Sequence, residues 1–164
     1  MGRGGIEPST VLVSLRTADD LNEVTKEWAA VGTDELTLAA PWRTFRWCLG
    51  RHYGGTYWSS TLRGPVICES RLELAGLLFA DFEPSVRHIV AQPFFLRATV
   101  DQKVCKHVPD HLLITDEALS LWMSSLSVAM ADPKVAFTLE WTRQIVEARG
   151  WRYEVATEPS AVEL

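Results

Sequence analysis

The sequence lacks several features that would assign it to a class at once. None of its apolar runs approaches the roughly 20 residues of a membrane span, so we expect no membrane partner. Its first ten residues, MGRGGIEPST, lack the long apolar region of a signal peptide, which favours a cytoplasmic protein. Its 3 cysteines are odd in number and lack metal-site spacing, which predicts free thiols. No glycine-rich phosphate loop followed by Lys-Ser or Lys-Thr is present, so we expect no nucleotide cofactor.

Charge is distributed unevenly along the 164 residues. The net charge of −5 argues against an indiscriminate nucleic-acid binder. We divide the chain into residues 1–40, an acidic extension with a short helix over 17–31, and residues 41–164, one α/β domain. The first part of that domain contains no acidic residue and interleaves aromatics with arginines that suit DNA phosphates, namely Arg43, Arg46 and Arg51. The aromatics would equally suit a packed core.

Hydrophobic periodicity predicts the elements of this domain. Residues 41–64 are expected to be irregular or a hairpin that turns within YGGTYW. Pro84 should end a first helix near Phe82, and Gly150 should cap a second one. We expect the strands to form one mixed sheet with both helices packed on it. The expected helices are 66–81 and 134–149, and the expected strands are 88–100, 103–115 and 151–155.

Three carboxylates are candidates for chemistry. Glu69 and Glu73 are one helical turn apart in a helix whose later turns are apolar. Asp110 follows a proline and enters an apolar strand, where an unpaired charge would be costly. A divalent cation shared with Glu73 would compensate for that charge, although Asp110 alone also fits an ordinary strand end. His107 and His111 suggest a His-Asp-His metal site, but a strand would place both on the face opposite Asp110.

Three short motifs together resemble a known family. Ser-x-x-Glu at 70–73, Gln-Pro at 92–93 and Pro-Asp at 109–110 are similar to motifs of the TnsA-like endonuclease subunits of heteromeric bacterial transposases. The resemblance covers roughly residues 41–163. It implies a restriction-endonuclease-like core, a mixed central sheet flanked by helices, in which Glu73 and Asp110 bind Mg²⁺. It also implies cutting of one DNA strand at transposon ends, beside a partner transposase subunit that handles the other strand.

Residues 119–126 depart from the family pattern, so the third core strand is degenerate. The pattern places an acidic or amide residue near Met123 and a lysine near Ser125, and neither residue present suits that work. Because Trp and Met are encoded only by TGG and ATG, the triplet that spans Trp122 and Met123 in the shifted frame is GAT, aspartate. Synonymous codons allow VPVDVKP around it. A frameshift and the divergence of an inactive paralogue are both open.

Two functions of different classes therefore remain. An endonuclease subunit would use Glu73 and Asp110 as Mg²⁺ ligands, and the absent lysine would impair its activity. A catalytically dead remnant would only bind double-stranded DNA or the partner transposase. Mg²⁺-dependent nicking of transposon-end DNA, measured with the partner present, separates the two.

Overall fold

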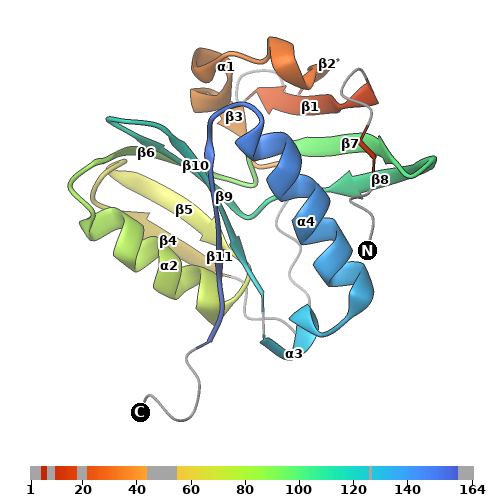
Figure 1. Cartoon of the computed structure of the whole chain (residues 1–164). Coiled ribbons are helices and arrows are strands. Elements are labelled where there is room, and N and C mark those ends of the chain that lie inside the picture. The colour runs from red at the N-terminus through yellow and green to blue at the C-terminus, as the bar shows by residue number, and fades with distance from the viewer. Residues whose placement is uncertain (1–4, 7–9, 18–21, 44–54, 126, 159–164) are drawn as a thin grey trace.

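The computed structural model describes residues 5–6, 10–17, 22–43, 55–125 and 127–158, which form three sheets with helices between them (Figure 1). None of the helices in these ranges has the length and the apolar content that crossing a membrane requires. In chain order the elements are β1 (Leu12–Thr17), β2 (Glu23–Glu27), the 3-10 helix η2 (Trp28–Ala30), α1 (Thr33–Thr37), β3 (Ala39–Ala40), β4 (Gly55–Ser59), β5 (Gly64–Cys68), α2 (Arg71–Phe82), β6 (Val86–Ala91), β7 (Phe95–Val100), β8 (Lys103–His107), β9 (His111–Thr115), β10 (Leu119–Ser124), α3 (Ser127–Met130), α4 (Pro133–Glu147) and β11 (Arg152–Ala156).

A mixed sheet in the order β11-β10-β9-β6 lies between α2 and α4 (Figure 1). β9 is antiparallel to both of its neighbours, and β11 is parallel to β10. Leu112 and Leu121 belong to the larger core cluster, together with Trp141 of α4. Leu113 instead packs against the smaller cluster, which contains Leu77 of α2. Because neighbouring side chains of a strand point to opposite faces, α2 and α4 cover opposite faces of this sheet. The α/β prediction is confirmed.

The described N-terminal residues form strands rather than the expected helix. β1 and β2 belong to a second sheet, in the order β2-β1-β7-β8, to which β3 adds by pairing with β1. The helix predicted over 17–31 is therefore wrong, since Glu23–Glu27 is a strand and only Trp28–Ala30 is helical. Val24, assigned to the apolar face of that helix, is 41% exposed. Backbone pairing with β1 outweighs the helical periodicity here. Six side chains of the described residues before 40 belong to the core cluster that includes α4: Val11, Val13, Leu15, Trp28, Val31 and Leu36.

The two expected strands over 88–100 and 103–115 do form a hairpin. Asp101 and Gln102 make its turn with φ angles of 48° and 64°, the left-handed pair that a two-residue type I′ turn requires. The hairpin is nevertheless divided between two sheets, because β7 pairs with β8 in one and β6 pairs with β9 in the other. The prediction of two continuous strands is wrong in this respect.

The two long strands of the hairpin are interrupted opposite each other, between β6 and β7 and between β8 and β9. The breaks contain Pro93 and Pro109, which cannot donate a backbone hydrogen bond to a continuing ladder. Gln92 leaves β6 with a positive φ of 44°, and its backbone N–H donates to the Asp110 carbonyl at 2.7 Å. The Gln-Pro and Pro-Asp motifs, 17 residues apart by numbering (109 − 92), therefore meet at the junction of the two sheets.

α2 starts later than predicted, at Arg71 rather than at residue 66. Residues 66–68 are held in β5 by antiparallel pairing with β4. Ser70 caps the helix, since its Oγ accepts a hydrogen bond from the Glu73 N–H at 3.1 Å. The helix ends at Phe82, as Pro84 predicts.

A hairpin does follow residue 54, but it is not the one predicted within 41–64, whose first strand would lie outside the described residues. β4 and β5 are joined by residues 60–63, whereas Gly55–Trp58 of the YGGTYW motif lie inside β4. The Asp81 carboxylate of α2 accepts hydrogen bonds from Tyr57, Ser59 and the backbone N–H groups of residues 60 and 61. These bonds hold the hairpin turn against the C-terminal turn of α2 and lower the pKa of Asp81 in spite of its desolvation.

The C-terminal elements agree closely with the prediction. Residues 119–124 occupy the expected strand position as β10, between β9 and β11. Asp132 caps α4 by accepting a hydrogen bond from Lys134 N–H, and Pro133 occupies its first turn. Gly150 has a φ of 78°, the left-handed conformation expected just beyond a helix end.

Candidate active site

The first turn of α2 directs a carboxylate into the molecule. Glu73 is only 7% exposed. Its carboxylate accepts hydrogen bonds from the Glu69 N–H at 2.9 Å and from Ser70 Oγ at 3.4 Å. The Ser-x-x-Glu motif therefore acts locally as a helix-capping motif, in which serine and glutamate each satisfy backbone donors at the helix start. This local role explains the spacing, but not the burial of a charged group.

Asp110 lies at the sheet junction, immediately before β9. Its carboxylate accepts two hydrogen bonds from one residue of β10, from the Ser124 N–H at 2.6 Å and from Ser124 Oγ at 3.0 Å. Its backbone carbonyl is held by Gln92. Asp110 is therefore fixed at both its main chain and its side chain. Its carboxylate keeps further lone pairs that can accept another ligand.

The charges of these two carboxylates oppose each other. Burial, followed by repulsion from the Asp110 charge, raises the pKa of Glu73 to about 7. Burial also raises the pKa of Asp110, against the opposing effect of the hydrogen bonds from Ser124 and of the Arg43 charge. The Asp110 charge thus disfavours the ionised form of Glu73.

A third carboxylate and an arginine complete the cluster. The buried Gln92 side chain donates from Nε2 to Glu69 Oε1 at 2.7 Å, and its Oε1 accepts the Arg43 N–H at 2.9 Å. The Arg43 guanidinium donates to Glu69 Oε2 at 3.1 Å. Glu69, Gln92 and Arg43 therefore form a closed ring of hydrogen bonds beside Glu73 and Asp110. We refer to these five residues as the carboxylate centre.

The cluster fits Mg²⁺ in its chemistry, with two protein ligands. Mg²⁺ prefers oxygen ligands and is commonly held by one or two carboxylates together with waters and substrate phosphates. Glu73 and Asp110 would supply the carboxylates, and both have lone pairs beyond the hydrogen bonds described above. Within the described ranges, no group of three or more His, Cys, Asp or Glu side chains is arranged to hold a metal ion, so protein side chains alone would not complete the coordination.

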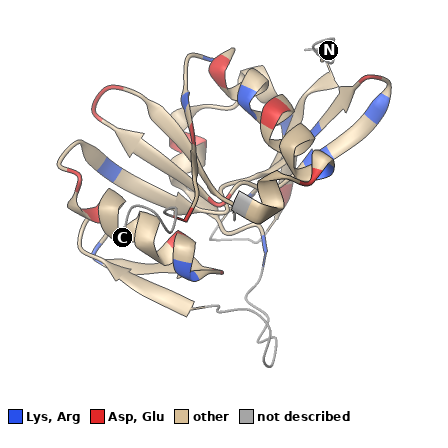
Figure 2. Cartoon of the chain, turned by 60° about the horizontal axis from the view of Figure 1, so that its bottom comes forward, with Lys and Arg blue, Asp and Glu red and all other residues tan. Residues whose placement is uncertain are grey.

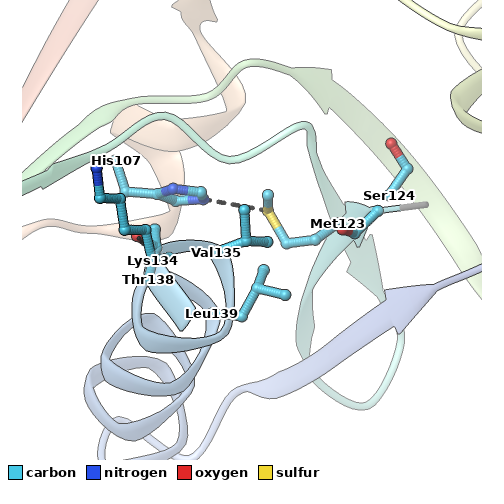
Figure 3. Close-up of a pocket in the computed structure, with 8 residues that line it drawn as sticks. His107, Met123, Ser124, Lys134, Val135, Thr138 and Leu139 are labelled. Atoms are coloured by element: carbon cyan, nitrogen blue, oxygen red, sulfur yellow. Dashed lines mark hydrogen bonds between the residues drawn. The ribbon is translucent and has the colours of Figure 1, made fainter. Parts of the chain in front are cut away.

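β10 presents its two faces to different surroundings. Ser124 bonds Asp110, and Trp122 packs over Gly76 of α2, so both belong to the face of the carboxylate centre. Met123 points the other way and places its sulfur 3.5 Å from His107 Nε2 (Figure 3). The sequence-based expectation put the missing acidic residue and lysine near Met123 and Ser125. Within β10, it is Ser124 that bonds Asp110, one position away from each of these two residues.

A cavity of about 280 Å³ lies on the opposite face, between β10 and α4. Its lining is mostly uncharged, with the hydroxyl groups of Ser125 and Thr138 and the ammonium group of Lys134 at α4. Figure 3 shows Met123 directed into this cavity toward His107, while the Ser124 hydroxyl points away from it. Ser124 is also one of the lining residues, so the cavity reaches the strand residue that bonds Asp110.

The alternative of a His-Asp-His metal site has no support in this geometry. His107 faces the cavity beside Met123, whereas His111 lies in the core with its ring 5.7 Å from that of Trp122. His111 Nε2 lies 3.2 Å from the Ile67 carbonyl. Burial lowers the pKa of both histidines to about 4, so both are neutral at neutral pH.

The expected DNA-contacting arginines are described only in part. Arg43 belongs to the carboxylate centre, while Arg46 and Arg51 lie outside the described residues. Over the described part of the chain, basic and acidic positions are scattered among ribbons that are mostly uncharged (Figure 2). Trp42 stacks on Phe95, with ring centroids 5.3 Å apart and planes at 12°, so this aromatic packs in the fold.

Sequence reasoning missed two members of the centre in their actual roles. The sequence singles out Gln92 only as part of the Gln-Pro motif, and its further signal is the proline that follows it and breaks the strand. The sequence gives no role to Ser124, whose backbone N–H and hydroxyl hold Asp110 by two hydrogen bonds. No family model matches the sequence and a search of curated proteins finds no match, so the function has to be argued from the carboxylate centre itself.

Proposed function

We propose that this chain is a metal-dependent DNA endonuclease subunit of a heteromeric transposase, with a restriction-endonuclease-like core. One observation supports this most directly: the buried carboxylate of Glu73 and the half-buried carboxylate of Asp110, which repel each other, are held by the motifs that resemble the TnsA-like family. Structural ion pairs place opposite charges together, whereas this site places like charges together. A divalent cation shared by the two would convert that repulsion into attraction.

The residues of the centre have distinct tasks in this proposal. Glu73 and Asp110 bind Mg²⁺, which when bound polarises a phosphate and lowers the pKa of a coordinated water. The backbone N–H of Glu69 holds the Glu73 carboxylate, and Ser124 holds the Asp110 carboxylate, so both ligands are oriented before the cation arrives. The DNA of a transposon end would be the substrate, and a partner transposase would cut the other strand.

The same geometry explains why the chain would be an impaired nuclease. β10 consists of LSLWMS and carries no charged residue. The resemblance calls for an acidic residue near Met123 and a lysine near Ser125, and neither these residues nor their neighbours Trp122 and Ser124 carry a charge. A missing cation at a phosphoryl-transfer centre typically costs several kcal/mol of transition-state stabilisation, with about tenfold in rate for each ~1.4 kcal/mol.

The second candidate function is a module that binds DNA or the partner transposase without cutting. The uncharged β10 favours it, since the strand keeps its place in the sheet while lacking catalytic groups. In this case the carboxylate centre would be a remnant, and cation binding would have no catalytic consequence.

Cation binding tests the endonuclease proposal without requiring activity. Calorimetric titration with Mn²⁺, which replaces Mg²⁺ in most oxygen-ligand sites, should show one ion bound per chain. Loss of a group that merely orients a ligand costs about 10–100-fold in metal affinity, so Glu73→Gln and Asp110→Asn should each weaken binding at least that much. Asp116→Asn, which removes an exposed carboxylate from its pair with Arg87, is the matched control and should bind normally.

Nicking then separates the two candidates. Transposon-end DNA is incubated with Mg²⁺ and the partner transposase, and single-strand cuts are scored. Slow nicking that disappears in Glu73→Gln supports the endonuclease, while cation binding without any nicking favours the binding module. If the unmodified chain binds no divalent cation, or binds it equally well in both variants, the endonuclease proposal is wrong.

The pH dependence of stability provides a further prediction. A pKa of about 7 in the folded protein against 4.5 in the unfolded chain means that the unfolded state loses its proton first as pH rises. The free energy of unfolding should therefore fall between pH 4.5 and 7, by a Glu73 contribution on the order of 3 kcal/mol. Urea denaturation at several pH values measures this. Glu73→Gln should flatten the profile and be the more stable protein at pH 8.

Glu83→Gln is the control for that measurement, because Glu83 is an exposed carboxylate at the end of the same helix. It should leave the slope of stability against pH unchanged. Saturating Mg²⁺ should restore part of the stability at pH 8 in the unmodified protein and none in Glu73→Gln. A profile that is identical in the unmodified and Glu73→Gln proteins would show that Glu73 ionises normally.

A further inference from the structure

Arg43 is held in place by an unusually complete set of backbone and ring contacts. The backbone N–H groups of Trp42 and Arg43 both donate to Gln92, to its main-chain and side-chain oxygens at 3.0 and 2.9 Å. The Trp42 ring stacks on Phe95, and the Arg16 guanidinium lies 4.6 Å from its centroid. Arg16 also donates to the Trp42 carbonyl at 2.6 Å. The backbone that carries Arg43 is thus fixed to the same Gln92 that holds Asp110.

The Arg43 side chain occupies the outer side of the carboxylate centre. Its guanidinium bonds Glu69 at 3.1 Å and its side chain is 50% exposed, whereas Glu73 behind it is 7% exposed. Its charge acts on Asp110, whose pKa it lowers against the larger effect of burial. A group approaching Glu73 and Asp110 from solvent would therefore meet Arg43.

Guanidinium is well suited to one class of such groups. Its planar fork matches two oxygens of a phosphate and forms charge-assisted hydrogen bonds with them. The exposed ion pair with Glu69 is weak, since such pairs contribute about 0–1 kcal/mol in water. Arg43 therefore loses little binding free energy when a phosphodiester replaces the Glu69 carboxylate as its partner.

We propose that Arg43 binds the same DNA phosphate that the divalent cation at Glu73 and Asp110 binds, and that Glu69 holds Arg43 until DNA arrives. This inference rests on the proposed endonuclease function. It makes Arg43 a ligand of the phosphate at the reaction centre rather than one of several contacts along the DNA backbone. It also assigns the cationic group of this site to the segment before β4 rather than to β10.

Binding of a short double-stranded DNA in Ca²⁺, which supports binding in many Mg²⁺ nucleases without cutting, tests the inference. Affinities are measured over a range of salt for the unmodified chain, Arg43→Ala and Arg43→Lys. Arg43→Ala should weaken binding about tenfold and reduce the slope of log affinity against log salt by about one phosphate contact. Arg43→Lys should keep the slope but lose part of the affinity, because lysine cannot make the bidentate contact. Glu69→Gln should strengthen binding, as it releases Arg43.

Two comparisons identify where the contact is made. Arg87→Ala removes an arginine from an exposed ion pair with Asp116 and should change neither the affinity nor the slope. In a Glu73→Gln/Asp110→Asn background, the additional effect of Arg43→Ala should shrink to less than about twofold, because the phosphate is no longer held there.

Each outcome decides between defined alternatives. If Ca²⁺ does not strengthen DNA binding by the unmodified chain, or strengthens it equally in the double variant, the endonuclease function fails. If Ca²⁺ acts through Glu73 and Asp110 but Arg43→Ala behaves like Arg87→Ala, only the Arg43 inference is overturned. The inference is also overturned if Arg43→Ala weakens DNA binding equally in the unmodified chain and in the Glu73→Gln/Asp110→Asn background. Arg43 would then contact DNA away from the two carboxylates. Should Arg43→Ala not fold, Arg43→Lys and Glu69→Gln carry the same comparison.

Discussion

Ser124→Lys should raise Mg²⁺-dependent nicking by about 100-fold over the unmodified chain, or more, because it adds a positioned cation to the reacting phosphate. Position 124 is the one whose side chain faces Asp110, at 3.0 Å from its carboxylate in the serine protein. The backbone N–H of residue 124 would continue to hold Asp110 after the substitution. Ser125→Lys should give little gain, since the side chain that bonds Asp110 is that of Ser124.

Single-strand cutting of transposon-end DNA with the partner transposase measures both variants. Writing VPVDVKP from residue 119 onward places its aspartate at position 122 and its lysine at position 124, so this exchange should give the largest gain if the strand still forms. Ser124→Lys combined with Glu73→Gln should be inactive, which controls for a lysine acting alone. Greater activity in Ser125→Lys than in Ser124→Lys would show that the face of β10 is assigned wrongly.

Trp122→Ala should lower the free energy of unfolding by about 3–5 kcal/mol, the largest stability effect that we expect. The indole is 9% exposed and fills the space between β10 and α2, beside the ring of His111. It lies so close to Gly76 that a Cβ built there would be 2.1 Å from two of its ring atoms. This contact positions the helix that carries Glu73, so the variant should also bind Mn²⁺ more weakly.

Gly76→Ala provides the complementary measurement. In the unmodified protein it should cost about 1–3 kcal/mol, because the added methyl group overpacks against a rigid ring. In the Trp122→Ala background the same substitution should instead stabilise by up to about 1 kcal/mol, since alanine favours helix more than glycine does. Urea denaturation of the four proteins completes the cycle. Additive effects of the two substitutions would show that the indole does not lie over Gly76.

Some parts of the molecule follow from local sequence. The turn at Asp101–Gln102, the end of α2 before Pro84, the capped helix α4 and its left-handed Gly150 each depend on residues within one turn of the feature. Local chemistry is enough there, because proline, glycine and capping side chains act on the backbone next to them.

Local sequence misled where residues with a helical pattern pair with a strand. Val24 and Trp28 show helical spacing, yet β1 draws residues 23–27 into a sheet, and the distant strand β7 completes it. Residues 66–68 would suit the start of α2, yet they pair with β4. In both places the hydrogen bonds between paired strands outweigh a modest intrinsic preference for helix.

The sequence by itself determined the α/β class and the two carboxylates worth examining. Prolines, capping residues and apolar patterns predict helices and strands from short segments alone. Only the tertiary structure decided how these carboxylates are surrounded. It divided one hairpin between two sheets, so that Gln92 meets Asp110, and it brought Arg43 to Glu69. It also decided which face of β10 Ser124 occupies, since strand register depends on the neighbouring strands, and a shift of one residue exchanges the two faces.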